Sequence, residues 1–252
     1  MAGSRATDRS PALGQHFLAS GRLAAQLVAD SGAGAGDRVV DLGAGSGILT
    51  AALAATGATV LAVEIDPALT GGLARRFADA EAANVTVLRA DARDVALPVN
   101  PYRIVANPPF GHTAAILHRL LDDPAGGLQR VDLVVQWQVA RHRAKVSEGG
   151  PTDLVGATWA PWWRFARGRR LHAACFRPRP AVDAAVLVVT RADPPGLPPE
   201  EFQRYEAFVR ANWGKGTATT DAHDWPSRYR GRAGHSPQQP SLHSRVESAN
   251  MG

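Results

Sequence analysis

A short apolar segment followed by three closely spaced glycines is the feature that most constrains the fold of this 252-residue chain. Residues 38–42 have the apolar, β-branched composition of a buried strand, and residues 48–55 favour a helix. Gly43, Gly45 and Gly47 permit a sharp turn and let a ligand approach the backbone. Strand, glycine turn and helix begin a nucleotide-binding βαβ unit. The spacing is G-x-G-x-G, which differs from the dinucleotide pattern G-x-G-x-x-G.

Four polar side chains lie at or just after the ends of successive apolar runs that we expect to be strands. The runs cover residues 38–42, 58–63, 85–89 and 102–106, and the polar residues are Asp41, Glu64, Asp91 and Asn107. Glu64 lies about 20 residues beyond the glycines, where an acid binds a ribose diol in such folds. Asp91 offers an acceptor for an adenine amino group. Because carboxyl ends of parallel strands share one crevice, these four residues predict a nucleoside site.

The segment Asn107-Pro108-Pro109-Phe110 has the composition of a site that holds a flat amine. An exocyclic adenine amine is a poor nucleophile, since its lone pair is delocalised into the ring. The Asn107 side-chain oxygen and the Pro108 carbonyl can accept its two hydrogens, and the prolines keep these acceptors in place. Phe110 can stack on a base removed from its RNA stack. Together with the nucleoside site, these residues suggest a protein that presents an aromatic amine to a nucleoside-bearing methyl donor.

The ordered motifs resemble the S-adenosylmethionine-dependent rRNA adenine N6-methyltransferases, and most closely the Erm type that confers macrolide, lincosamide and streptogramin B resistance. The resemblance covers roughly residues 12–190. Gly14 to Leu18 is similar to G-Q-N-F-L, and Asn107 to Phe110 to the catalytic corner N-I-P-[YF]. Residues 136–143 are similar to Q-x-E-x-A-x-K, and residues 176–183 match F-x-P-x-P-x-V-D.

The resemblance implies an α/β fold, a Rossmann-like methyltransferase sheet with helices on both faces, and S-adenosylmethionine as methyl donor. It also implies which residues act. The catalytic residues would be Asn107, Pro108 and Phe110. The donor-binding residues would be Gln15, His16, Leu18, Asp41, Gly43, Gly45, Glu64, Ile65, Asp91, Ala92 and Asn107.

Two departures from the family pattern stand out. His16 replaces the Asn that the family usually has near the methionine part of the donor. The resemblance therefore supports a donor contact at this position less than at the others. The carboxyl-terminal helical domain is also cut short. We expect a flexible arm at 1–13, a catalytic domain at 14–190, a residual helical segment at 191–214 and a disordered tail at 215–252. Within the catalytic domain we expect later strands near residues 131–136, 169–176 and 184–190.

Basic residues are concentrated between residues 141 and 180, where there are nine Lys or Arg residues and only two acidic residues. Tryptophans 159, 162 and 163 are interleaved with them, and we assign these to the core. Basic side chains neutralise phosphates. We expect RNA binding by the arginines, because a cluster of cations repels itself without a polyanion, and we expect the tail to matter much less. The RNA-binding candidates are Arg141, Arg143, Arg164, Arg167, Arg169 and Arg170.

Composition limits the remaining possibilities. The chain has one cysteine, Cys175, no metal-ligand cluster, no apolar run of about 20 residues and no signal-peptide core, so we expect a cytoplasmic monomer without a metal or membrane contact. The leading hypothesis is methylation of 23S rRNA, protein-free or pre-ribosomal. Alternatives are a small-subunit rRNA adenine dimethyltransferase, a DNA adenine methyltransferase, and a non-catalytic nucleic-acid-binding relative.

Overall fold

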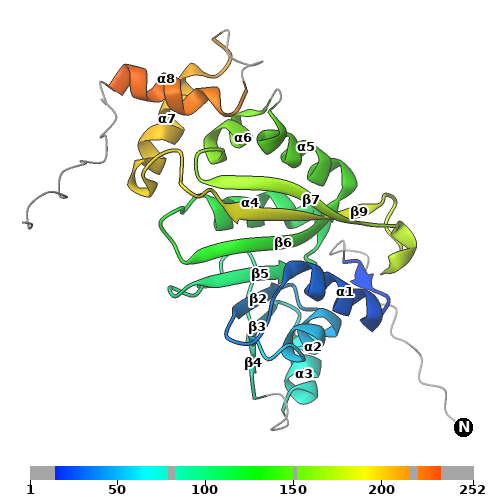
Figure 1. Ribbon diagram of the computed structural model, residues 1–252. Coiled ribbons are helices and arrows are strands. Elements are labelled where there is room, and N and C mark those ends of the chain that lie inside the picture. Colours follow the sequence, from blue (N-terminus) through cyan, green and yellow to red (C-terminus); the bar gives the residue numbers. More distant parts are fainter. Residues whose placement is uncertain (1–14, 79–82, 150–151, 216–220, 234–252) are drawn as a thin grey trace, which may run out of the picture.

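A computed structural model describes residues 15–78, 83–149, 152–215 and 221–233 of the chain (Figure 1). Its centre is a seven-stranded sheet in the order β4-β3-β2-β5-β6-β9-β7. The neighbouring pairs from β4 to β6 are parallel, and β9 runs antiparallel to both β6 and β7. The strands are β2 (Arg38–Leu42), β3 (Thr59–Glu64), β4 (Val85–Arg89), β5 (Tyr102–Ala106), β6 (Leu128–Gln136), β7 (Trp163–Leu171) and β9 (Ala184–Arg191).

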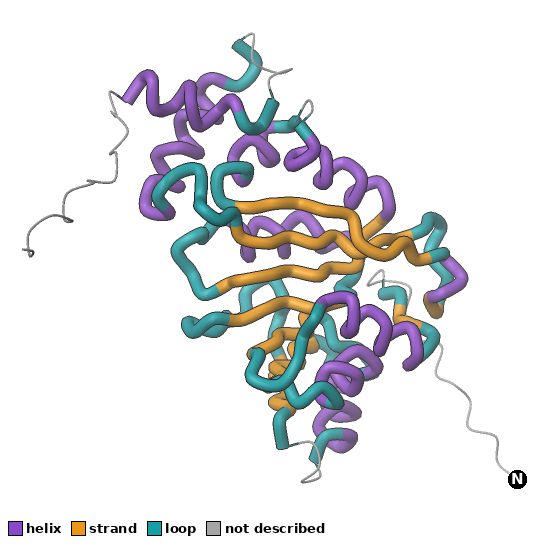
Figure 2. The backbone as a smooth tube through the Cα atoms, viewed as in Figure 1, coloured by secondary structure: helices purple, strands orange, loops and turns teal. Residues whose placement is uncertain are grey.

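Helices cover both faces of the sheet, as predicted (Figure 2). The helices are α1 (Gly21–Ser31), α2 (Ile48–Ala54), α3 (Pro67–Arg76), α4 (Thr113–Leu121), α5 (Trp137–Glu148), α6 (Leu154–Trp159), α7 (Phe202–Asn212) and α8 (Asp224–Ala233). Alternate strand residues point to opposite faces. Val39 and Val105 therefore pack in the core beside α1 and α2, whereas Val40 and Ile104 pack in the core beside α4 and α5.

The strand order reverses beside β2, which lies between β3 and β5. Helices therefore leave the sheet in opposite directions at this point, and a crevice opens at the carboxyl ends of the strands. A small antiparallel ribbon lies apart from the main sheet. It joins β1 (Phe17–Leu18) to β8 (Phe176–Arg177), so the amino-terminal G-Q-H-F-L segment meets the F-x-P-x-P segment.

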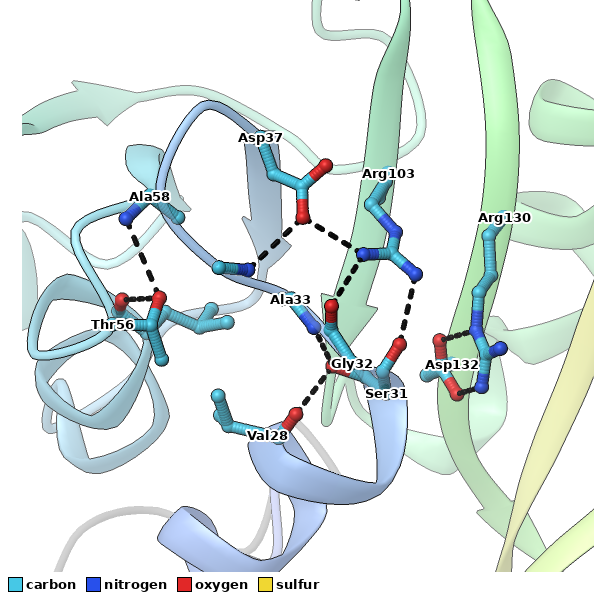
Figure 3. Close-up of polar contacts among 12 residues, drawn as sticks. Val28, Ser31, Gly32, Ala33, Asp37, Thr56, Ala58, Arg103, Arg130 and Asp132 are labelled. Atoms are coloured by element: carbon cyan, nitrogen blue, oxygen red, sulfur yellow. Dashed lines mark hydrogen bonds and ion pairs between the residues drawn. The ribbon is translucent and has the colours of Figure 1, made fainter.

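A half-buried arginine holds the end of α1 against the sheet (Figure 3). The guanidinium of Arg103, on β5, donates to the carbonyl oxygens of Ser31 and Gly32 at 2.8 and 2.9 Å and pairs with Asp37 at 2.8 Å. These carbonyls lie at the helix end, where the last turn has no intrahelical donors. The contact fixes the end of α1, the helix that follows the described residues 15–20 at the crevice.

The boundaries of two predicted elements need correction. The strand expected at residues 169–176 is instead β7 (Trp163–Leu171), followed by a 3-10 turn at Ala173–Cys175. The tail expected to be disordered contains α8, so that prediction is wrong for residues 221–233. Trp225 and Tyr229 are buried there because α8 packs on Tyr205 of α7. The predicted arm at 1–13 and residues 216–220 and 234–252 lie outside the described residues.

Tryptophans 159, 162 and 163 are buried, which confirms their assignment to the core. Trp162 connects the core of the sheet to helix α7, because its ring contacts Phe202 and Tyr205 of that helix. Within the part of the chain that the structure describes, no helix has the length and apolar character needed to cross a membrane, and no group of three or more His, Cys, Asp or Glu could hold a metal ion.

Candidate active site

A cavity of about 190 Å³ lies at the switch point, at the carboxyl ends of β2 to β5. The structure brings most of the predicted donor-binding residues together around it. Its lining includes Gln15, His16, Gly43, Glu64, Ile65, Asp91, Ala92 and Asn107. A smaller cavity of about 20 Å³ shares Gly43 and Asn107 with it and is lined by Leu18 and Asp41. Gly45 lines neither cavity, and its backbone N–H donates a hydrogen bond to Glu64.

Glu64, the last residue of β3, is held rigidly by backbone amides. One carboxylate oxygen accepts from Gly45 N at 2.9 Å, and the other accepts from Ile65 N and Asp66 N at 2.9 Å each. The side chain is 2% exposed, yet it lines the cavity. Since an anionic oxygen can accept more than one hydrogen bond, Glu64 keeps acceptor capacity for a diol. The glycine turn therefore has a second role, because it fixes this acid.

Asp41 is a buried acid beneath the glycine turn. Its carboxyl accepts a hydrogen bond from Thr50 Oγ1 at 2.7 Å, and loss of solvation on burial raises its pKa to about 7, with Glu64 adding a smaller repulsion. Asp41 lines only the smaller cavity. Asp41 is therefore placed to stabilise the turn between β2 and α2, because its partner Thr50 belongs to the first turn of that helix.

Replacing Asp41 with Asn is expected to change how stability depends on pH. The native state keeps the Asp41 proton up to about pH 7, whereas the unfolded carboxyl releases it near 3.8. This group therefore makes the wild-type free energy of unfolding fall as pH rises between those values, by up to about 1.4 kcal/mol per pH unit. Denaturant titrations of both proteins from pH 4 to 8 measure the difference. If the free energies of unfolding of the two proteins changed in parallel with pH, the raised pKa assigned to Asp41 would be contradicted.

Asp91 lies just after β4 and is engaged by an arginine that the sequence interpretation missed. Arg93 Nε donates to both Asp91 oxygens, at 2.9 and 3.1 Å. This ion pair lowers the pKa of Asp91 to about 2, and His112 contributes a smaller favourable interaction. Arg93 and His112 both line the cavity, together with Phe17 and Pro109. The two-residue spacing in Asp91-Ala92-Arg93 was the available signal for Arg93.

Asn107 follows β5 and presents a buried oxygen with no partner. Its Nδ2 donates to the backbone carbonyl of His16 at 2.8 Å, which fixes the orientation of the amide. Its Oδ1 is buried, and no donor in the described residues reaches it. Buried polar atoms are normally satisfied, so such an atom marks a group prepared for a ligand. The atom is an acceptor, and it therefore fits a ligand N–H or O–H.

The segment from Asn107 to Phe110, the predicted catalytic corner, is packed directly against the glycine turn. A Cβ built on Gly43 would lie 3.3 Å from the Cα of Pro108. Phe110 is half-buried, with its ring 5.3 Å from the His16 ring and 6.1 Å, edge-on, from Phe176. His16 also hydrogen-bonds through Nδ1 with the carbonyl oxygen of Pro178 at 2.9 Å. Three distant motifs therefore converge on one corner.

The arginines predicted to bind RNA lie on or near β7, an edge strand, and on α5. Four of the six are paired with acids: Arg143 with Asp153, Arg167 with Glu148, Arg169 with Asp30 and Arg170 with Asp183. Arg164 donates to backbone carbonyls, and Arg141 is exposed. The argument that this cluster repels itself is wrong for the paired residues. Their binding to RNA stays a prediction.

Comparison with known proteins agrees with this geometry. The family described as ribosomal RNA adenine dimethylase matches residues 7–214, and the chain belongs to it. Ribosomal RNA small subunit methyltransferase A of Sphingopyxis alaskensis is 36% identical over 203 residues, which cover 77% of this chain and 74% of that protein. Mycinamicin-resistance protein MyrB of Micromonospora griseorubida is 36% identical over 162 residues, which cover 64% of this chain but only 49% of MyrB.

Among solved structures, the 23S rRNA methyltransferase ErmE has a TM-score of 0.68 and 26% identity. The match covers 79% of this chain and 80% of that chain. This likeness confirms the predicted Rossmann-like methyltransferase fold.

Proposed function

We propose that this chain transfers a methyl group from S-adenosylmethionine to N6 of an adenine in 23S rRNA, and so confers resistance to macrolide, lincosamide and streptogramin B antibiotics. The observation that carries the proposal is the buried, unpartnered Oδ1 of Asn107 beside a cavity lined by Glu64 and Asp91. It joins an acceptor for an amine to a site for a nucleoside. The substrate is protein-free or pre-ribosomal RNA, and the enzyme works as a cytoplasmic monomer.

The residues around the cavity fit the methyl donor. Glu64 is the acceptor for the ribose hydroxyls, and Asp91 is the acceptor at the adenine end. Gln15, His16 and Leu18 line the side that faces Asn107, where the methionine part would lie. When bound, S-adenosylmethionine supplies an already activated methyl group, so the protein needs no metal and no covalent nucleophile.

The protein's own contribution is to position and polarise the target amine. Asn107 Oδ1 accepts one amine hydrogen, because the His16 carbonyl holds the amide in the required orientation. The Pro108 carbonyl accepts the other, and Phe110 stacks on the base. These acceptors favour a pyramidal nitrogen whose lone pair points at the methyl group, and a fixed geometry of this kind lowers the barrier.

The alternative is methylation of the small-subunit rRNA. The identity with the Sphingopyxis enzyme supports it, whereas the N-P-P-F corner and the match to ErmE favour 23S rRNA. Primer extension on both rRNAs from cells that express the chain separates the two. A new stop in 23S rRNA together with macrolide resistance is expected. A stop confined to small-subunit rRNA would overturn the proposal.

Replacing Gly43 with Ala is expected to weaken donor binding at least tenfold. Gly43 has φ +77°, and the new Cβ would lie 3.3 Å from backbone of the catalytic corner, so the clash cannot be relieved by a rotamer change. The left-handed conformation alone costs roughly 1–2 kcal/mol with a side chain. Calorimetry with S-adenosylmethionine measures the loss. Gly72→Ala, a helical position with open space, should bind the donor normally, and equal effects would contradict the argument.

A further inference from the structure

A groove between α7 and α8 gathers positive charge that the fold leaves without acidic partners. This groove has a volume of about 350 Å³, within the range of small-ligand sites. Its lining comprises Phe208, Asn212, Lys215, Trp225, Arg228 and Arg232, with three cations and no acid. In contrast to the arginines on β7, Lys215, Arg228 and Arg232 form no ion pair with any acid in the described residues.

A buried donor without a partner lies in the same groove. Trp225 is 0% exposed, and its Nε1 has no hydrogen-bond partner in the described part of the chain. Leaving a buried N–H unsatisfied costs about 1–3 kcal/mol. An indole N–H can only donate, so it requires an acceptor. A buried donor in a groove lined by three cations fits an anionic oxygen.

Aromatic rings form the apolar part of the groove. Trp213 stacks on Trp225 with 5.6 Å between ring centroids, and Phe208 meets Trp225 edge-on. The Arg232 guanidinium lies over the half-buried Phe208 ring at 5.8 Å. Flat rings and guanidinium planes beside phosphate-binding cations are the combination that binds unpaired RNA. The groove therefore offers chemistry for both a phosphate and its neighbouring base.

We propose that the α7–α8 groove binds a phosphodiester and adjoining base of single-stranded RNA, as a second contact with the substrate. The inference rests on the proposed rRNA methylation for the identity of the RNA. Figure 1 places α7 and α8 at the opposite end of the molecule from α1 to α3. The family match ends at residue 214, so Phe208 and Asn212 lie within it. The three groove cations and Trp225 lie beyond it.

The first test compares two double variants of the full chain. Lys215→Gln with Arg228→Gln removes two groove cations. Arg204→Gln with Arg210→Gln removes two exposed α7 cations that do not line the groove. The probe is a labelled, adenine-free oligoribonucleotide, so its binding is independent of methyl transfer. Each lost phosphate contact should reduce the slope of log affinity against log salt by roughly 0.7.

We expect the groove variant to lose roughly 0.7 to 1.4 of that slope and the control variant to keep it. Donor binding should be normal in both proteins. Equal slopes in all three proteins, or equal losses in both variants, would overturn the groove assignment while leaving the methyltransferase proposal intact. Failure of wild-type methylation with a groove-specific slope change would instead overturn only the proposed reaction.

The second test follows the Trp225 indole N–H by ¹H–¹⁵N spectroscopy, with Trp225→Phe identifying the resonance. The oligoribonucleotide should shift this resonance in a saturable manner. An equal shift with inorganic phosphate alone would reveal a small-anion site and overturn the RNA proposal. A shift caused by deleting residues 234–252, without RNA, would show that the chain's own tail fills the groove, and would also overturn it.

Discussion

Replacing Asn107 with Ala is expected to slow single-turnover methyl transfer by about 100-fold or more, the usual cost of losing one preorganised polar contact to the transition state. The reason is specific to one atom. Asn107 Oδ1 is buried and has no partner among the described residues, while its Nδ2 is committed to the His16 carbonyl. Donor affinity should change by less than several-fold, because the reacting amine rather than the donor uses this oxygen.

The matched control is His16→Asn, which restores the residue usual in the family. Asn107 contacts the backbone carbonyl of residue 16, so this variant keeps the contact and changes only the side chain. Its transfer rate should remain within several-fold of the wild type. Single-turnover assays on protein-free 23S rRNA decide the matter. A near-normal rate in Asn107→Ala would show that the catalytic corner is misassigned.

The crevice was predictable from sequence because it depends on strand ends alone. Residues 38–42, 85–89 and 102–106 form strands with the predicted bounds. Parallel strands expose their carboxyl ends at one edge, so Glu64 and Asn107 had to meet there. Local contacts within the crevice were not predictable in this way. The engagement of Asp91 by Arg93 depends on side-chain conformations in a loop, and strand periodicity carries no information about it.

The errors in the charge and tail predictions have different physical causes. Sequence counts treat charges as neighbours when they are close along the chain, whereas Arg169 finds Asp30 and Arg170 finds Asp183 only through the fold. In the tail, Gly, Ser and Pro obscured a helical pattern. Ala222, Trp225 and Tyr229 recur at helical spacing, and all three are buried in the same core cluster. That periodicity was the available signal for α8.

Replacing Glu64 with Gln is expected to weaken binding of S-adenosylmethionine by roughly 10- to 150-fold, since hydrogen bonds to a charged group are worth about 1.5–3 kcal/mol. Two effects combine. The carboxylate is the proposed acceptor for the ribose hydroxyls. Its oxygens also accept from three backbone amides, those of Gly45, Ile65 and Asp66. A glutamine amide group must turn its own N–H donors towards at least one of these amides, so the glycine turn loses its support.

The control for this variant is Asp66→Asn, which removes one negative charge two residues away. Asp66 caps α3 by accepting from the amides of Ala68 and Leu69, and it does not line the cavity. Asparagine caps helices about as well as aspartate, so fold and donor binding should both persist. Calorimetry and thermal unfolding of both variants separate the contributions. If Glu64→Gln and Asp66→Asn weakened donor binding by the same factor, general electrostatics rather than a ribose contact would explain the effect of the acid at the end of β3.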